Sequence, residues 1–350
     1  MRYTIEEAKR RLAAYRGRPL RIMEVCGTHT HEIFRLGLRS LLPEQVQMIS
    51  GPGCPVCVTP VSFIDEARSL ALEKGVTVAT FGDLLRVPGS EGTLAQAKAQ
   101  GADVRMVYSP FDALEAAKKE PRRQVVFLSV GFETTTPGEA LAVQEALRQG
   151  VANFFLLTAN KTMPAAYEAL RGSADAFLYP GHVHAIIGTQ VCERLRREQG
   201  VSGVVAGFTA GELLSALAAL LDGAERGEPF FYNEYENVAH AEGNPAAQRT
   251  VEEVMEPCDA RWRGLGVIAG SGLRLREEYA AQDAARRFAL GGGTGRENPA
   301  CRCGEVLRGA ITPRQCPLFG RGCTPEHPVG ACMVSGEGAC AAFFLYGAPD

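Results

Sequence analysis

The stretch LSVGFETTTPGEALAVQEALRQGVANFFLLTANKTMP, residues 128–164, contains the pattern from which the fold is predicted. A short apolar run is followed by a polar loop, a helix-length segment and a second apolar run. Near-continuous apolar strands that alternate with helices are typical of parallel sheets covered on both faces. Residues 23–60, MEVCGTHTHEIFRLGLRSLLPEQVQMISGPGCPVCVTP, follow the same order. This similarity of pattern predicts two related α/β domains.

The alternation of strands and helices extends over about the first 225 residues. The candidate strands are LRIMEV (20–25), VQMIS (46–50), VTVAT (76–80), VRMVYS (104–109), QVVFLSV (124–130), NFFLLTA (153–159), AFLYP (176–180) and SGVVAGF (202–208). Beyond them the rhythm fails: residues 230–255 look like loop and helix, and GGGTG at 291–295 opens a Cys-, Pro- and Gly-rich end. We therefore expect an α/β fold with two similar parallel-sheet domains and a cysteine-rich third domain. The expected ranges are 20–120, 121–225, and 226–350 together with an N-terminal helix at 1–19.

The composition is that of a globular protein and excludes several classes of function. Of 350 residues, 46% are hydrophobic and 22% charged, and the net charge of −3 gives no basic excess for nucleic-acid binding. The N-terminus has no apolar signal region, and no apolar stretch is long enough to span a membrane, so we expect a cytoplasmic protein without a membrane partner. In a reducing compartment, eleven cysteines favour metal binding or redox chemistry over a disulfide framework.

Three early cysteines and a histidine follow two of the candidate strands. Cys26 and His29 belong to CGTHTH (26–31), and Cys54 and Cys57 form a CxxC within GPGCPVCVTP (51–60). In open α/β sheets, ligand groups gather at the carboxyl ends of strands. A CxxC pair binds a metal or forms a redox-active disulfide, while CGTHTH alone fits a strand-end turn or a thiol nucleophile equally. Taken together, three thiols and an imidazole are a soft ligand set for iron, zinc or copper.

The late cysteines suggest an iron–sulfur cluster. Six residues separate Cys316 from Cys323, sixteen more precede Cys340, and Cys301 or Cys303 completes a set of four. Widely and unequally spaced thiolates on Gly/Pro-rich loops suit a 4Fe–4S cluster, whereas a structural zinc more often has paired CxxC knuckles. Cys332 has apolar neighbours and is interpreted as a packed thiol.

Two further motifs carry polar side chains. GFETTTP (131–137) includes Glu133 and opens a helix, where its threonines either cap the helix or form a polar wall for an anion. His182 and His184 in GHVHAIIG (181–188) alternate, so on an extended segment they face the same side. They are candidate ligands, proton carriers or hydrogen-bonded loop histidines.

These motifs, in this order along nearly the whole chain, resemble the HypD family of hydrogenase maturation factors. The resemblance rests on CGTHTH, GPGCPVCVTP, GFETTTP, GHVHAIIG and the end CPLFGRGCTPEHPVGACMVSGEGAC. It implies two α/β domains and a third domain with a 4Fe–4S cluster. It also implies a cytoplasmic scaffold that works with a small HypC partner. The HypE/HypF pair then supplies cyanide to iron, and the Fe(CN)2CO unit passes to the large subunit of a nickel–iron hydrogenase.

The resemblance also implies roles for residues. Cys26, Cys54 and Cys57 belong to the iron site, with His29 beside them, and His29 and Glu133 act as proton carriers or orienting groups. Cys26 and one cysteine of the CxxC bind iron, and a HypC cysteine adds a sulfur. The cluster ligands are Cys303, Cys316, Cys323 and Cys340, with Cys301 as the alternative to Cys303. The cluster supplies electrons for reductive cyanide transfer, and a Cys54–Cys57 dithiol/disulfide step connects the two sites.

Two other classes of function remain open from the residues. One is an iron–sulfur thiol–disulfide oxidoreductase that uses only Cys54 and Cys57. The other is a structural-zinc binding module, which predicts a colourless protein. Cys26 distinguishes the oxidoreductase from the scaffold, because a plain dithiol reductase does not need this residue.

Overall fold

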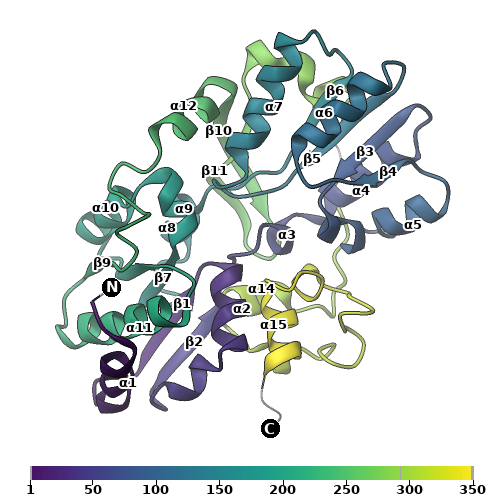
Figure 1. The fold of residues 1–350 in the computed structure, drawn as a ribbon. Coiled ribbons are helices and arrows are strands. Elements are labelled where there is room, and N and C mark those ends of the chain that lie inside the picture. The colour runs from purple at the N-terminus through teal and green to yellow at the C-terminus, as the bar shows by residue number, and fades with distance from the viewer. Residues whose placement is uncertain (1, 292, 348–350) are drawn as a thin grey trace.

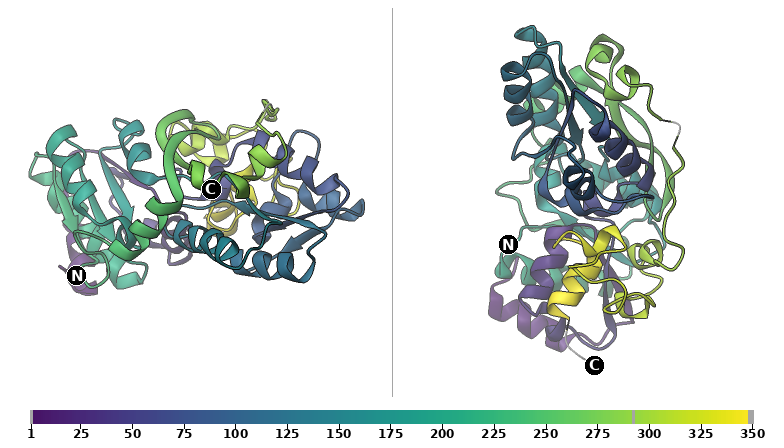
Figure 2. Two further views of the ribbon diagram at one scale, coloured as in Figure 1. Left: turned by 90° about the horizontal axis from the view of Figure 1, so that it is seen from above. Right: turned by 90° about the vertical axis from the view of Figure 1, so that its right-hand side faces the viewer.

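The fold is seen in a computed structural model that describes residues 2–291 and 293–347. Residues 1, 292 and 348–350, which belong to the predicted N-terminal helix, the GGGTG segment and the predicted third domain, lie outside the described part. Figures 1 and 2 show two sheets in separate lobes, with a long hairpin and the C-terminal segment along their junction. The predicted α/β class is confirmed, with two parallel sheets and a cysteine-rich end.

The first lobe is built on a five-stranded sheet. In spatial order its strands are β2 (Val46–Ser50), β1 (Leu20–Glu24), β7 (Ala176–Pro180), β8 (Gly203–Ala206) and β9 (Phe231–Asn233). Every pairing is parallel. The chain order reverses between β1 and β7, so the loops that follow these two strands leave in opposite directions. Such a switch point opens a crevice at the carboxyl edge of the sheet.

The second lobe repeats this topology on a four-stranded sheet. In spatial order its strands are β4 (Val104–Met106), β3 (Val76–Thr80), β5 (Gln124–Ser129) and β6 (Phe154–Thr158). All pairings are again parallel, and the chain order reverses between β3 and β5. Each of the eight candidate strands contains a strand of the structure. The prediction succeeds because strands of a sheet buried on both faces form uninterrupted apolar runs, which are recognisable in the sequence.

The membership of the sheets differs from the predicted ranges. β1 and β2 share a sheet with β7–β9, while β3–β6 form the other sheet, so each lobe takes strands from both 20–120 and 121–225. The chain therefore crosses between the lobes after β2 and returns after β6. Local sequence patterns specify a strand but not its partners, which explains why the pattern alone gave consecutive ranges.

Helices cover both faces of each sheet. The α-helices are α1 (Ile5–Ala14), α2 (Gly27–Arg35), α3 (Pro55–Val58), α4 (Val61–Leu72), α5 (Leu94–Ala99), α6 (Pro110–Lys119), α7 (Thr136–Arg148), α8 (Met163–Ala169), α9 (Gly181–Ile187), α10 (Gln190–Gln199), α11 (Ala210–Glu225), α12 (Pro245–Val254), α13 (Ala284–Arg287), α14 (Cys303–Leu307) and α15 (Ala339–Tyr346). The short 3-10 helices are η1 (Leu38–Leu41), η2 (Gly82–Arg86), η3 (Glu277–Gln282), η4 (Pro313–Gln315) and η5 (Ala331–Met333). Among the described residues, no helix is both long and apolar enough to cross a bilayer.

The N-terminal helix packs against the five-stranded lobe and not against the cysteine-rich end. Ala8 and Leu12 of α1 lie in one buried cluster with Leu213 and Leu217 of α11. The expectation that α1 joins the third domain therefore differs from the structure. The apolar residues of α1 recur with the period of a helix and form a stripe along one face. This stripe is buried against α11.

A hairpin that the sequence pattern did not predict crosses between the lobes. It consists of β10 (Met255–Trp262) and β11 (Gly266–Leu275), which pair in antiparallel register (Figure 1). Trp262 is fully buried and stacks on Phe132, with ring centroids 5.9 Å apart. The same cluster contains Met23 and Val25 from β1 and its end, so one apolar core joins the two lobes.

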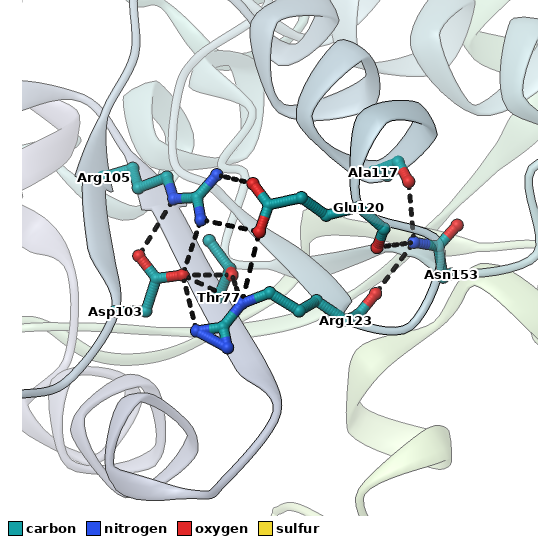
Figure 3. A network of polar contacts seen from close by, with 7 residues as sticks. All are labelled: Thr77, Asp103, Arg105, Ala117, Glu120, Arg123 and Asn153. Atoms are coloured by element: carbon teal, nitrogen blue, oxygen red, sulfur yellow. Dashed lines mark hydrogen bonds and ion pairs between the residues drawn. The ribbon is translucent and has the colours of Figure 1, made fainter.

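At the amino ends of β3–β6, away from the carboxyl edge, a polar network fixes the second lobe (Figure 3). Arg105 pairs with Asp103 at 2.7 Å and also with Glu120, and Arg123 pairs with Asp103 at 2.9 Å. Asn153, the residue before β6, donates to three backbone carbonyls of the segment that precedes β5. Burial raises the pKa of Asp103, but hydrogen bonds from Arg105 and Thr77 outweigh it and bring the pKa down to about 2.

We predict that Asp103→Asn destabilises the protein in a pH-dependent way. The folded pKa lies below the ordinary 3.8, so the carboxylate contributes stability above that value and loses it as the pH falls toward 2. At pH 7 the loss is about 1–2 kcal/mol after allowance for partial exposure. Urea unfolding between pH 7 and pH 3 measures it, with exposed Glu228→Gln as control. A deficit that stays constant over this range would contradict the prediction.

Candidate metal centre

Cys26 and Cys54 lie beside each other because the strands before them are paired. β1 and β2 are in parallel register, with Glu24 opposite Ser50, and the two loops leave the same edge. Gly53 packs directly on Cys26: a Cβ on Gly53 would lie 2.2 Å from the Cys26 nitrogen. The Gly27 N–H donates to the Gly53 carbonyl at 2.9 Å. The predicted iron-site loops are therefore in contact through their backbones.

The loop after β1 is the start of a helix and not the polar turn that the sequence suggested. Cys26 occupies the N-cap of α2, and its thiol is buried. Burial raises the pKa of Cys26 to about 12, although the backbone N–H groups of His29 and Thr28 oppose the rise. These N–H groups favour negative charge on the sulfur, so the position suits a thiolate once a cation compensates for the lost hydration.

The CxxC is also helical, with Cys54 at the N-cap of α3. The Cys57 N–H donates to the Cys54 sulfur at 3.2 Å, which places the two thiols close together. The Cys57 thiol is fully buried, and burial, together with Cys54, raises its pKa well above the ordinary value. Cys57 also interacts electrostatically with Cys340 and lies 3.9 Å from the Ala331 carbonyl. The CxxC thus borders the late cysteines.

Glu337 is a site residue that the sequence reasoning missed. Its carboxylate accepts a hydrogen bond from the Thr28 hydroxyl at 2.7 Å, and its charge acts on both Cys26 and Cys57. Gly27 makes this approach possible, since a Cβ there would lie 2.5 Å from the Glu337 Cβ. The only sequence signal is an acidic residue in the Gly-rich run VSGEGAC, directly before Cys340.

The histidines are buried, and their roles differ. The His29 Nε2–H donates to the Gly207 carbonyl at 2.9 Å, which leaves Nδ1 as a buried acceptor without a partner among the described residues. Burial lowers the pKa of His29 to about 3, so the ring is neutral near pH 7. GHVHAIIG is not extended: His182 and His184 lie on α9, where residues two apart face different directions, so the condition under which they would share a side is not met.

His184 belongs to a buried network behind the site. Its Nδ1–H donates to the Gly188 carbonyl at 2.9 Å, so Nε2 accepts from the Tyr167 hydroxyl at 3.3 Å. The Cys192 sulfur lies 3.4 Å from the same nitrogen. His182 instead stacks on Phe208, which also stacks on His29. Neither His182 nor His184 meets the early thiols directly.

Glu133 follows β5 at the switch point of the second sheet. Its Oε1 accepts the Met163 N–H at 2.8 Å, while Oε2 is buried without a partner among the described residues. Burial raises the pKa of Glu133 to about 7. Tyr167 interacts electrostatically with both Glu133 and Cys26. The threonine cap is not formed: Thr135, at the N-cap of α7, makes no side-chain capping bond.

The late cysteines line one small apolar cavity. Its lining thiols are Cys301, Cys303, Cys316, Cys323, Cys332 and Cys340. Cys303 and Cys332 are joined as a disulfide, whereas the other four are free. Cys340 interacts electrostatically with Cys323, Cys301 and Cys316, and burial raises its pKa above the ordinary range. The free set therefore contains Cys301, the alternative fourth ligand, and not Cys303.

The donor set around this cavity fits a cluster better than a single ion. Across the described residues, no three His, Cys, Asp or Glu side chains already converge as ligands of one metal ion. A 4Fe–4S cluster places its four thiolates on different corners, so its ligands need not converge on a point. Four free thiols around a cavity with apolar neighbours such as Leu318 and Phe319 match that requirement. The same cavity is poorly suited to a hydrated hard cation.

Comparisons with known proteins give a consistent family assignment. A family model described as "HypD: Hydrogenase formation hypA family" matches residues 2–347. Proteins named hydrogenase maturation factor HypD from Rhodobacter capsulatus and Escherichia coli are each 46% identical to the chain, over 339 and 336 residues. Each alignment covers 94% of the chain and 90% of the relative. The protein of that name from Cupriavidus necator is 46% identical, with 96% of the chain and 92% of the relative covered.

We predict that Gly53→Ala separates the two early loops. The added Cβ meets the Cys26 backbone, which cannot move away without disturbing β1, so we expect a loss of about 1–3 kcal/mol in unfolding free energy. Maleimide labelling of Cys26 and Cys54 should become faster. Gly138→Ala in α7 is the control, because nothing lies within 4 Å of its Cβ position. Equal stability and equal labelling of Gly53→Ala and wild type would refute the contact.

Proposed function

The chain belongs to the HypD family of hydrogenase maturation factors, and on that premise we propose that it is the scaffold on which the Fe(CN)2CO unit is assembled. Its partners are a small HypC-type protein and HypE, which together with HypF supplies the cyanide, and the product goes to a nickel–iron hydrogenase large subunit. The observation that carries the proposal is the contact between the Cys26 loop and the CxxC loop. We infer a cytoplasmic protein without nucleic-acid partners.

The early thiols hold the iron substrate. Cys26 and either Cys54 or Cys57 bind it as thiolates, and a cysteine of the HypC-type partner adds a further sulfur. Support comes from the closeness of the two loops and from the N–H groups that face the Cys26 sulfur. Two or three protein ligands leave positions open on the iron for cyanide and carbon monoxide. Because buried thiols must lose protons to bind, iron uptake releases protons in the site.

Glu133 accepts and returns protons, and His29 orients a hydrogen-bond donor. With a pKa near 7, Glu133 is partly protonated at neutral pH and is suited to accept and return protons. His29 stays neutral and is fixed by its hydrogen bond to Gly207, so its open Nδ1 orients a hydrogen-bond donor beside Cys26. This division of roles follows from burial, which disfavours charge on both side chains.

Cys301, Cys316, Cys323 and Cys340 hold the 4Fe–4S cluster, with Cys303 as the alternative to Cys301. When bound, the cluster supplies the electrons that reductive transfer of cyanide from a thiocyanate carrier requires. Oxidation of the Cys54–Cys57 dithiol to a disulfide releases two electrons and two protons, and cleavage of the S–CN bond of a thiocyanate to a thiol and cyanide consumes two electrons and one proton; electrons from the cluster would then return the disulfide to the dithiol. The proximity of Cys57 to Cys340 supports a connection between the two thiol sets.

The proposed iron site is tested by infrared spectroscopy. We expect the chain, purified without oxygen together with its HypC-type partner, to show sharp bands of metal-bound cyanide and carbon monoxide. Cys26→Ala and Cys54→Ala should lose these bands while iron and sulfide of the cluster remain. Cys258→Ala, on the hairpin, is the control and should keep both signals. A brown protein without such bands, in which Cys26→Ala keeps dithiol reductase activity, would instead identify an oxidoreductase.

The fourth cluster ligand is tested by paired variants. Because Cys301 is free and Cys303 is joined to Cys332, we expect Cys301→Ala to lose most of its iron and acid-labile sulfide. Cys303→Ala and Cys332→Ala should retain wild-type content and visible absorbance. The reverse result, loss in Cys303→Ala alone, would assign the ligand to Cys303. A colourless wild-type protein that contains zinc would contradict the cluster itself.

A further inference from the structure

Arg263 is a buried cation without a counter-charge in contact. It lies at the end of β10, its residue is only 4% exposed, and its Nη1 has no hydrogen-bond partner among the described residues. Within the same part of the chain, no carboxylate oxygen approaches its guanidinium to 4.0 Å or less. An unpaired buried guanidinium is unfavourable, since it loses hydration without compensation. A native protein that retains such a group needs an explanation for it.

The backbone around Arg263 joins the two sets of thiols. The Arg263 N–H donates to the Val58 carbonyl at 2.7 Å, directly after Cys57 in the CxxC helix α3. The next residue, Gly264, packs on α14: a Cβ there would lie 2.4 Å from the Cα of Gly304. In Figure 1 the lower end of the hairpin reaches the region of α3 and α14. The hairpin turn is therefore wedged between the CxxC and the cysteine-rich segment.

The charge of Arg263 acts on a thiol of each set. It interacts electrostatically with the carboxylate of Glu297, which is not in contact with it, and then with Cys301 and Cys57. Neutral thiols give a guanidinium little compensation, whereas thiolates and an anionic cluster give a great deal. The missing counter-charge is thus supplied when sulfur in this region carries negative charge.

We propose that Arg263 is a positioning residue whose buried guanidinium is the shared counter-charge for anionic sulfur at the CxxC and in the cluster cavity. The inference rests on the proposed function, because it takes the cavity to hold a 4Fe–4S cluster. Reduction adds one electron and one negative charge to the cluster. A fixed cation nearby stabilises that reduced state, and net charge and hydrogen bonds to sulfur are what set such potentials. Arg263 therefore makes the cluster easier to reduce.

The first test is a redox titration of the cluster in three variants, with a chemical reductant and the visible spectrum as readout. At fixed potential, we expect Arg263→Gln to lower the reduced-to-oxidised ratio about tenfold, which is about 59 mV for one electron. Arg263→Lys keeps the charge and should stay within about threefold of wild type. Arg308→Gln is the matched control: Arg308 donates to the Gly264 carbonyl from an exposed position, so it holds the same turn without a buried charge.

A second measurement separates the role in charge from a role in folding. In protein freed of iron and sulfide, Arg263→Gln should unfold at a Tm equal to or above that of wild type, because it removes an unpaired buried cation. In cluster-loaded protein the order should reverse. A variant less stable in both forms, with an unchanged potential, would show that Arg263 only holds the turn and would overturn the inference.

The failure of this inference is distinguishable from failure of the proposed function. An unchanged potential in a wild-type-like cluster overturns the role of Arg263 alone. A wild-type chain that takes up no cluster overturns the cofactor assignment, and the inference with it. Infrared bands of iron-bound cyanide are measured independently of both results.

Discussion

The contact between the Gly53 and Cys26 backbones is the constraint on which the rest of the site depends. It follows from the parallel pairing of β1 with β2, which brings both loops to one edge in fixed register. Main-chain packing of this kind forms together with the sheet, so the thiols are placed before any ligand arrives. A site assembled in advance does not lose binding energy to loop ordering. The thiols of the CxxC then reach the late cysteines without further rearrangement.

Burial is the common cause of the unusual acid–base properties of the site. It raises the pKa of Cys26 to about 12 and that of Glu133 to about 7, and it lowers that of His29 to about 3. In each case the neutral form is favoured, so these side chains contribute little charge to the site, in contrast to Glu337. A metal cation that enters changes this balance, because thiolate formation then becomes favourable and protons must leave. Glu133 is the group whose pKa suits it to accept them.

The sequence predicted local structure well and tertiary relations poorly. The eight strands are found because buried parallel strands need continuous apolar runs, and the motif loops lie at the carboxyl edges because parallel sheets place them there. Interleaving of the sheets has no local signal, and neither does the contact between Thr28 and Glu337, which are 309 positions apart. The helix after Cys26 was predicted but begins earlier than expected, and the short helix after Cys54 was missed, because cysteine is not a usual N-cap residue. The helix that contains His182 was not predicted for a related reason: a short polar motif is equally compatible with a turn and with a helix.

The path of the chain explains why the proposed site lies where the lobes meet. After β2 the chain leaves the first lobe through the CxxC helix, and after β6 it returns through α8, which carries Tyr167. Each crossing places polar residues at the carboxyl edge of a sheet, and the hairpin β10–β11 closes the junction with Trp262 on Phe132. The distances between Cys26, Cys57 and the late cysteines are therefore determined by both lobes together. After β9 the chain crosses the junction again, since α12 packs on α7 and α13 on β6, so the segments that connect the lobes also hold the geometry of the proposed site.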